Sequence, residues 1–144
     1  MAVYPPLLTL ADEAAYRARF EAIYCAGALT TFDGIAVRFQ KRDFDHCFFE
    51  SSRRNRVKDT FSTLRAERLE WIAVALQDAA ADRFLGWDRD SKTYDKTRRV
   101  TLVCGNYVVV IALTGTTSAR FITAYVADTS RTLAKLKTSP KWMP

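Results

Sequence analysis

The only histidine of the chain, His46, lies in a segment whose residue types suit both proton transfer and phosphate binding. An unperturbed imidazole titrates near neutral pH and can therefore act as an acid or a base under physiological conditions. Asp43 and Asp45 precede this residue and could orient its ring, and basic residues follow it. Cleavage of RNA needs a base at the ribose 2′-hydroxyl, an acid at the leaving oxygen and cations on the phosphate oxygens. Histidine, arginine and lysine supply these functions without a metal, although a lone histidine more often has only a packing or surface role.

Basic side chains are concentrated in residues 41–58 and 89–99, which the sequence predicts to be loops. Loops are where a fold commonly displays functional side chains. Arginine binds phosphate through two hydrogen bonds and lysine acts as a point charge, so these residues are candidate phosphate ligands. The alternative is a solvated charged surface that only confers solubility. The candidates in these two segments are Arg53, Arg54, Lys58, Arg98 and Arg99.

Residues 59–81 are predicted to be helical because apolar side chains recur along them at helical spacing. A break near Ser62 and Thr63 would divide this region into two helices. Arg65 and Arg68 lie three positions apart, so on one helix they would share a face and reach the same site. Equally, these two arginines would pair with neighbouring glutamates on the surface.

The last predicted strand carries a pair of hydroxyl side chains, Thr123 and Tyr125. Residues two apart on a strand point to the same face, so this pair projects together while Ile122 and Ala124 face the other way. Arg120 lies just before the pair. Two hydroxyls beside a basic residue, on a sheet with an apolar reverse side, are suited to hold a phosphate or a base. The simpler explanation is that threonine and tyrosine are common strand residues.

Large aromatic side chains are candidates for stacking on nucleic-acid bases. Trp87 lies beside the second basic segment and is the best placed of them, whereas Trp71 falls in the predicted helix and is expected to belong to the core.

The cysteines and carboxylates give no sign of a metal or nucleotide cofactor. Cys25, Cys47 and Cys104 are odd in number and widely spaced, which argues against a disulfide framework and a zinc knuckle. No paired carboxylates lie with a histidine at metal-ligand spacing, and no glycine-rich phosphate loop is present. We therefore expect no metal site and no cofactor.

The composition is that of one globular domain spanning residues 1–144. The chain is 49% hydrophobic and carries a formal net charge of +6. A basic balance is consistent with a phosphate-bearing partner, although many basic proteins bind none. No apolar run approaches the roughly 18 residues that a membrane span requires, and the N-terminus does not resemble a secretory signal. We therefore expect a cytoplasmic protein that makes no membrane contact.

Helices are predicted before strands along the chain, which indicates the α+β class. We expect N-terminal helices packed on a C-terminal antiparallel sheet, a meander of three to four strands. Gly27 would stop the first helix, and Gly105 with Asn106 would form the tight turn of a hairpin. The predicted elements are a helix over 11–26, strands over 34–39, 99–104, 107–113 and 120–126, and a short helix over 129–137.

This order of elements resembles the Barnase–EndoU–colicin–RelE superfamily of small ribonucleases, especially its phage and mobile-element branch. The resemblance covers about residues 44–128 and depends on His46 followed by basic residues, and on a final strand reading Phe-Ile-Thr-Ala-Tyr over 121–125.

The resemblance implies a helical segment on a four-stranded antiparallel sheet, with the site on the open face of the sheet. It implies metal-independent endoribonuclease activity, in which the 2′-hydroxyl attacks and a cyclic phosphate is left. His46 would be the acid/base residue, and Thr123 and Tyr125 would line the substrate site. Because the second histidine of some members is missing, Tyr125 or a lysine would be the partner acid.

The resemblance further implies RNA as substrate, a role as a toxin or phage or mobile-element effector, and an acidic inhibitor protein as partner. The missing histidine leaves open an alternative function, a non-catalytic nucleic-acid-binding or interaction module that uses the same basic face. A structural α+β protein whose charges only confer solubility is the third hypothesis.

Overall fold

The computed structural model describes residues 3–50, 60–88, 93–127 and 129–138, and describes only the backbone at 86–88 and 93–98. Its helices are α1 (Glu13–Tyr24), α2 (Asp43–Phe48), α3 (Thr63–Ala66), α4 (Trp71–Leu76) and α5 (Ser130–Lys137). No helix within these ranges has the length and apolar character that a membrane crossing requires.

Helix α1 forms where the sequence predicts a helix. The carboxylate of Asp12 accepts a hydrogen bond from the Ala15 amide at 2.9 Å and so caps the first turn. Tyr16, Phe20 and Tyr24 recur at intervals of four residues and are buried along one face. The helix ends three residues before Gly27.

The predicted long helix over 59–81 is replaced by strand β4 (Thr60–Phe61) and the two short helices α3 and α4. The break between the two helices lies at residues 67–70, later than the break near Ser62 and Thr63 that the sequence indicated. The Tyr24 hydroxyl donates to the Leu69 carbonyl at 2.6 Å and accepts from the Ala73 amide at 3.1 Å. A continuous helix would join these two backbone groups directly, so the inserted hydroxyl takes the place of a helical hydrogen bond.

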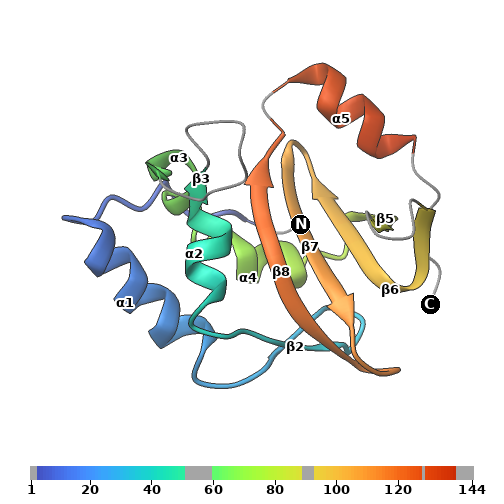
Figure 1. Ribbon diagram of the computed structural model, residues 1–144, viewed down its shortest axis with the longest axis horizontal. Coiled ribbons are helices and arrows are strands. Elements are labelled where there is room, and N and C mark those ends of the chain that lie inside the picture. Colours follow the sequence, from blue (N-terminus) through green and yellow to red (C-terminus); the bar gives the residue numbers. More distant parts are fainter. Residues whose placement is uncertain (1–2, 51–59, 89–92, 128, 139–144) are drawn as a thin grey trace.

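The main sheet has six strands in the order β1-β2-β8-β7-β6-β5 (Figure 1). All neighbouring strands are antiparallel except β2 and β8, which run parallel. The α+β class and the meander are thus as predicted, but the sheet is larger and mixed. Its strands are β1 (Leu29–Thr30), β2 (Ala36–Arg38), β5 (Asp82–Asp88), β6 (Thr93–Cys104), β7 (Tyr107–Leu113) and β8 (Ser118–Val126); β3 (Phe49–Glu50) and β4 form a separate pair.

Both basic segments that the sequence assigned to loops contain regular structure. Residues 43–48 form α2, and residues 93–99 are part of β6. Strand β5, which the sequence did not predict, supplies the pairing partner that extends the β6 hairpin. The turn between β6 and β7 contains Gly105 at a φ of +65°, a left-handed conformation that favours glycine.

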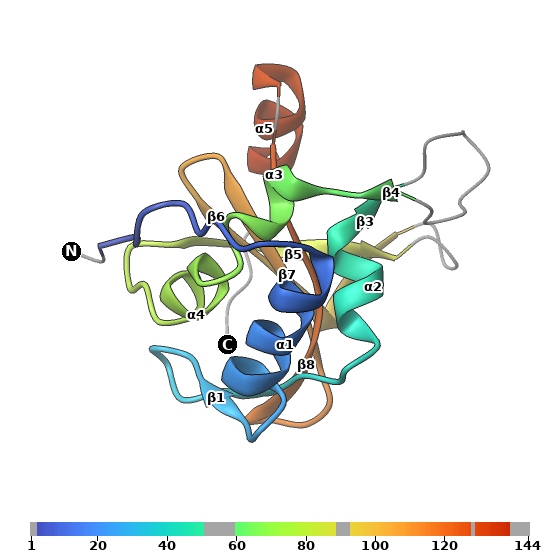
Figure 2. The same cartoon turned by 90° about the vertical axis from the view of Figure 1, so that its left-hand side faces the viewer.

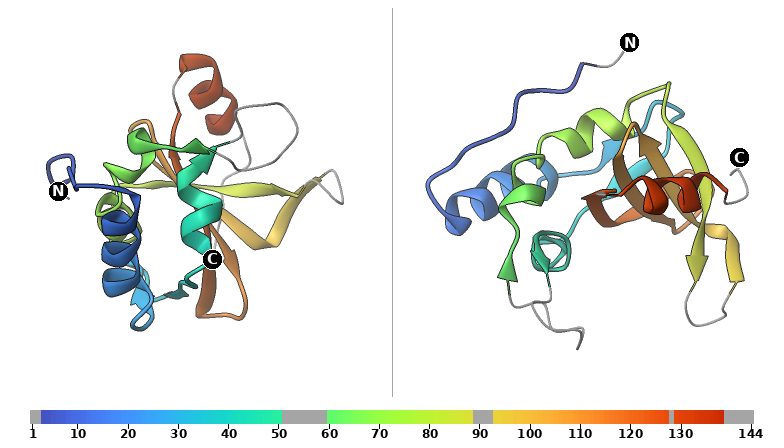
Figure 3. Two further views of the ribbon diagram at one scale, coloured as in Figure 1. Left: turned by 60° about the vertical axis from the view of Figure 1, so that its left-hand side comes forward. Right: turned by 90° about the horizontal axis from the view of Figure 1, so that it is seen from above.

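The helices cover one face of the sheet and build an aromatic core there. In Figure 1, α4 passes behind β8 and β7, and the views in Figures 2 and 3 place α1 beside α4. Phe20 of α1 is fully buried and has the rings of Phe44, Phe48 and Phe121 within 6.5 Å of its own ring centroid. Helix α2 lies along β8, and α5 stands beyond the end of the sheet. The opposite face of the sheet, which we call the open face, carries the candidate site.

Candidate functional site

A bulge in β8 determines which side chains reach the open face of the sheet. Thr123 pairs with Val110 of β7, whereas Phe121 pairs with the next residue of β7, Ile111. Successive residues of β7 point to opposite faces, so Thr123 and Phe121 do so too, with Ile122 as the extra residue between them. Because Phe121 lies in the core, Thr123 lies on the open face.

Three arginines form a row across this open face. Arg120 pairs with Ala112 of β7 and with Arg38 of the parallel strand β2, and Ala112 also pairs with Arg99 of β6. Paired residues on neighbouring strands point to the same face. Arg38, Arg120 and Arg99 are therefore aligned on the face of Thr123, and we call them the arginine row. Strands lie about 4.8 Å apart, so the row is about 14 Å long.

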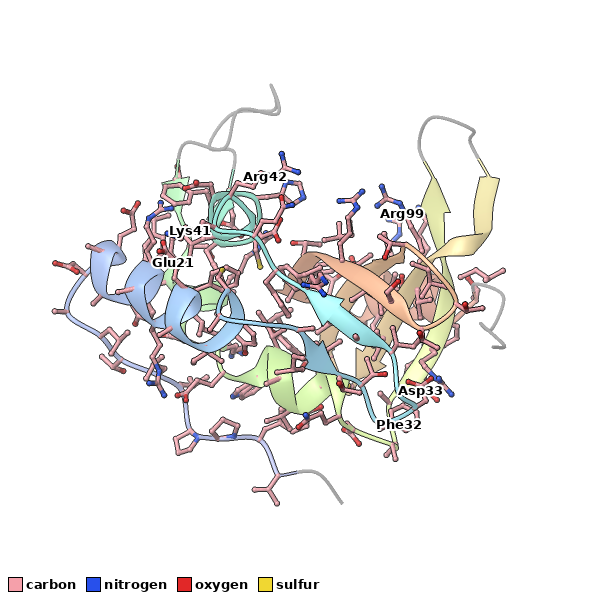
Figure 4. All side chains as sticks on the ribbon, turned by 90° about the horizontal axis from the view of Figure 1, so that it is seen from below. Glu21, Phe32, Asp33, Lys41, Arg42 and Arg99 are labelled. Carbon is pink, nitrogen blue, oxygen red and sulfur yellow. The ribbon has the colours of Figure 1, made fainter. Side chains whose placement is uncertain are left out.

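The arginine row makes no salt bridge within the part of the chain that the structure describes, and neither does the exposed Arg42 at the start of α2. Figure 4 shows Arg42 and Arg99 pointing to the same side of the molecule. The described residues that do form salt bridges are paired as Arg17–Asp45, Arg19–Glu70, Lys41–Glu21, Arg65–Glu50, Arg68–Glu67 and Arg83–Asp33.

Like charges at paired strand positions are destabilising. Arg38 and Arg120 are such a pair, since both are exposed and they lie opposite each other on neighbouring strands. The pairing of Arg38 with Arg120 therefore brings like charges together, and a bound anion would relieve their repulsion. Guanidinium groups without a carboxylate partner are suited to bind an anion, and above all a phosphate.

A buried cysteine holds α2 against the edge of β8. The Cys47 thiol donates to the Ala124 carbonyl and accepts from the Ala124 amide, both at 3.3 Å. These contacts replace a neighbouring strand, because β2 pairs with β8 only as far as Arg120. Burial raises the pKa of Cys47 to about 11, although hydrogen bonds from Ala124 and the Thr123 hydroxyl act against this shift. The thiol thus stays protonated at neutral pH and can donate.

His46 is exposed on α2, directly before the cysteine that contacts β8. Of its two acidic neighbours, Asp45 is engaged elsewhere, since both its oxygens accept from the Arg17 guanidinium, at 2.6 and 3.3 Å. Asp43 is half-buried, and burial raises its pKa, while a hydrogen bond from the Gln40 amide and electrostatic interactions with Arg42, His46 and Arg120 act in the other direction. Asp43 is therefore the carboxylate coupled electrostatically to both the histidine and the arginine row.

Tyr125 lies under an arginine that joins three elements. The Arg65 guanidinium is 6.0 Å from the centroid of the Tyr125 ring, donates to the Cys47 carbonyl at 3.1 Å and pairs with Glu50 at 3.3 Å. Burial raises the pKa of Tyr125, and the charge of Arg65 opposes this shift. The phenol is thus protonated at neutral pH and can donate a hydrogen bond. Arg65 belongs to the site through this contact.

Arg68 lies away from the site. Its guanidinium is 5.2 Å from the Trp71 ring and donates to the Leu64 carbonyl at 2.6 Å. Because α3 ends at Ala66, the structure separates the two arginines that helical spacing placed on one face. Arg68 instead pairs with Glu67, the surface pairing that the sequence left open.

The other predicted ligands are placed only in part. Arg53, Arg54 and Lys58 lie outside the described residues, and Trp87 and Arg98 lie in β5 and β6 at positions where only the backbone is described.

Sequence reasoning missed Arg38 and Arg42. The alternation of Ile35, Val37 and Phe39 did place Arg38 on the polar side of a strand. However, no local pattern indicates that this strand runs parallel to β8 and so aligns Arg38 with Arg120.

Among the residues that the structure describes, no three histidine, cysteine or carboxylate side chains are grouped as metal ligands. Comparison of the chain with protein-family models, curated proteins and solved structures gives no match.

Proposed function

We propose that the open face of the sheet binds RNA through its phosphates and that the protein is a metal-independent endoribonuclease. The arginine row carries this proposal: three aligned arginines that form no salt bridge with a described residue, on the face of the hydroxyl pair. Non-specific affinity for nucleic acid comes mainly from such phosphate contacts. A helical layer on one face of the sheet, with the other face open, is also the arrangement that the resemblance to small ribonucleases implies.

The proposed reaction is attack of the ribose 2′-oxygen on the adjacent phosphorus, with loss of the 5′-oxygen of the next nucleotide. His46 takes the 2′-hydroxyl proton as the attack proceeds, and the protonated phenol of Tyr125 donates a proton to the leaving oxygen. Arg120 and Arg38 stabilise the charge on the phosphate oxygens. The products are a 2′,3′-cyclic phosphate and a free 5′-hydroxyl, and the phenolate then recovers its proton from solvent or from His46.

A ribonuclease inside a cell would damage the RNA of that cell unless its activity were inhibited. The role we propose is that of a toxin or an effector of a phage or mobile element. A protein that neutralised it at the arginine row would present carboxylates there, so an acidic inhibitor is the partner that this chemistry fits.

An RNA-cleavage assay with EDTA present tests the proposal, using the full chain together with His46→Ala and Tyr125→Phe. We expect cleavage by the parent protein to yield cyclic-phosphate ends, and removal of His46 to slow it by about 10²–10⁴-fold, the usual contribution of a general acid or base. Binding of RNA by the His46 variant is expected to be nearly unchanged.

Cleavage at the parent rate in both variants would contradict the assigned site. Absence of cleavage by the parent protein, with RNA binding that weakens steeply as salt is added, would establish the alternative, a non-catalytic binding module.

A further inference from the structure

We infer that the arginine row is a track for several successive phosphates, which makes an oligonucleotide, and not a single nucleotide, the ligand of the site. This inference rests on the proposed function, because it concerns the same face of the sheet. It adds the direction in which the nucleic acid lies, across the strands from β2 to β6, and the minimum length that it must have.

The register of the sheet gives the row its direction. Arg38, Arg120 and Arg99 come from β2, β8 and β6, and all three are at paired positions, so the row runs perpendicular to the strands. Arg120 and Arg99 are separated by the whole width of β7. A single phosphate held by Arg120 therefore leaves Arg99 without a ligand.

The residue between these two arginines is small. Ala112 of β7 pairs with both Arg120 and Arg99 and is 6% exposed. Ala112 is covered by its neighbours, and its methyl group does not project between the two arginines that flank it. A longer side chain there would occupy the space between them.

One member of the row lies next to the proposed acid/base residue. Helix α2 packs on β8, and the charge of Asp43 on this helix is coupled to both His46 and Arg120. The reacting phosphate thus belongs at Arg120, the middle member of the row. Arg99 lies two strand spacings, about 10 Å, from Arg120. An RNA strand that crosses the row therefore meets Arg99 with a different phosphate from the one at Arg120.

Binding measured against oligonucleotide length tests the track. The probes are fluorescently labelled RNAs, a dinucleotide, a tetranucleotide and an octanucleotide, and the protein carries His46→Ala so that no RNA is cut during the measurement. We expect affinity to rise steeply from the dinucleotide to the octanucleotide. Adding Arg99→Gln should weaken octanucleotide binding several-fold, lower its salt dependence by about one phosphate contact, and leave dinucleotide binding unchanged.

Arg19→Gln is the matched control, because it removes the same charge from α1, where Arg19 pairs with Glu70. It should change binding of none of the probes. Ala112→Asp provides a second variant, since it places a carboxylate between Arg120 and Arg99. We expect it to weaken octanucleotide binding more than Arg99→Gln does, and circular dichroism of the variant must match that of the parent protein before the two are compared.

The outcomes separate the track from the proposed function. Affinity that does not depend on length, or an Arg99→Gln variant that weakens dinucleotide and octanucleotide binding equally, would overturn the track and leave RNA binding intact. Absence of binding to RNA of every length would overturn both.

Discussion

The two faces of the six-stranded sheet carry different kinds of side chain. On the helical face, Phe20, Phe121 and Cys47 are buried, and no buried polar side-chain atom among the described residues lacks a hydrogen-bond partner. On the open face, Arg38 and Arg120 lie side by side as like charges, and neither forms a salt bridge with a described residue. The open face also buries Val103 and Val108, so the contrast belongs to the arginine row, where like charges lie side by side and a bound anion would offset their repulsion.

The largest effect on stability is expected from the aromatic core. Phe20→Ala removes a fully buried ring that contacts the rings of several other aromatic residues, and should lower the free energy of unfolding by about 3–5 kcal/mol. Urea unfolding monitored by circular dichroism measures this change. Arg99→Ala on the open face is the comparison, and an equal loss there would contradict the division between the two faces.

Cys47, where α2 contacts the edge of β8, should have an intermediate effect on stability. Cys47→Ala leaves the carbonyl and amide of Ala124 without a partner at the edge of β8. An unsatisfied buried group of this kind costs about 1–3 kcal/mol. Cys47→Ser keeps a donor and an acceptor at the same position and should unfold at a higher urea concentration than the alanine variant. The reverse order would show that the thiol acts there only by packing.

The smallest effect on stability is expected from Asp43, whose pKa is raised mainly by burial. A carboxyl with a raised pKa in the folded state binds protons more tightly there than in the unfolded chain. Its contribution to stability is therefore fully present below the unfolded-state pKa and is lost as pH rises through the folded-state pKa. Asp43→Asn should remove this part of the pH dependence, and stability curves that remain superimposable over that range would contradict the assignment.

Local sequence patterns predicted those elements whose determinants lie within a few residues. The helical pattern over 11–26 with Gly27 as its stop indicated α1, and the β-branched run at 107–113 indicated β7. The predictions failed where a distant residue intervenes. The Tyr24 hydroxyl interrupts the predicted long helix at Leu69 and Ala73, which lie more than forty positions away.

The candidate site could be predicted only in part for the same reason. Alternation along β8 placed Thr123 and Tyr125 on one face, as the structure has them. Strict alternation would put Arg120 on the other face. The bulge at Ile122 moves it to the face of Thr123 and Tyr125. A bulge depends on the register with β7, and the neighbouring Arg38 depends on parallel pairing with β2. Neither feature has a signal in the local sequence.

Paired measurement of stability and RNA affinity in Arg120→Gln tests the central claim most directly. Arg120 stands in the middle of the arginine row, is exposed and makes no salt bridge with a described residue. We predict that its replacement weakens octanucleotide binding several-fold and reduces the salt dependence by about one phosphate contact, while stability stays equal or rises slightly because repulsion from Arg38 is removed. Lower stability with unchanged RNA affinity would contradict the account.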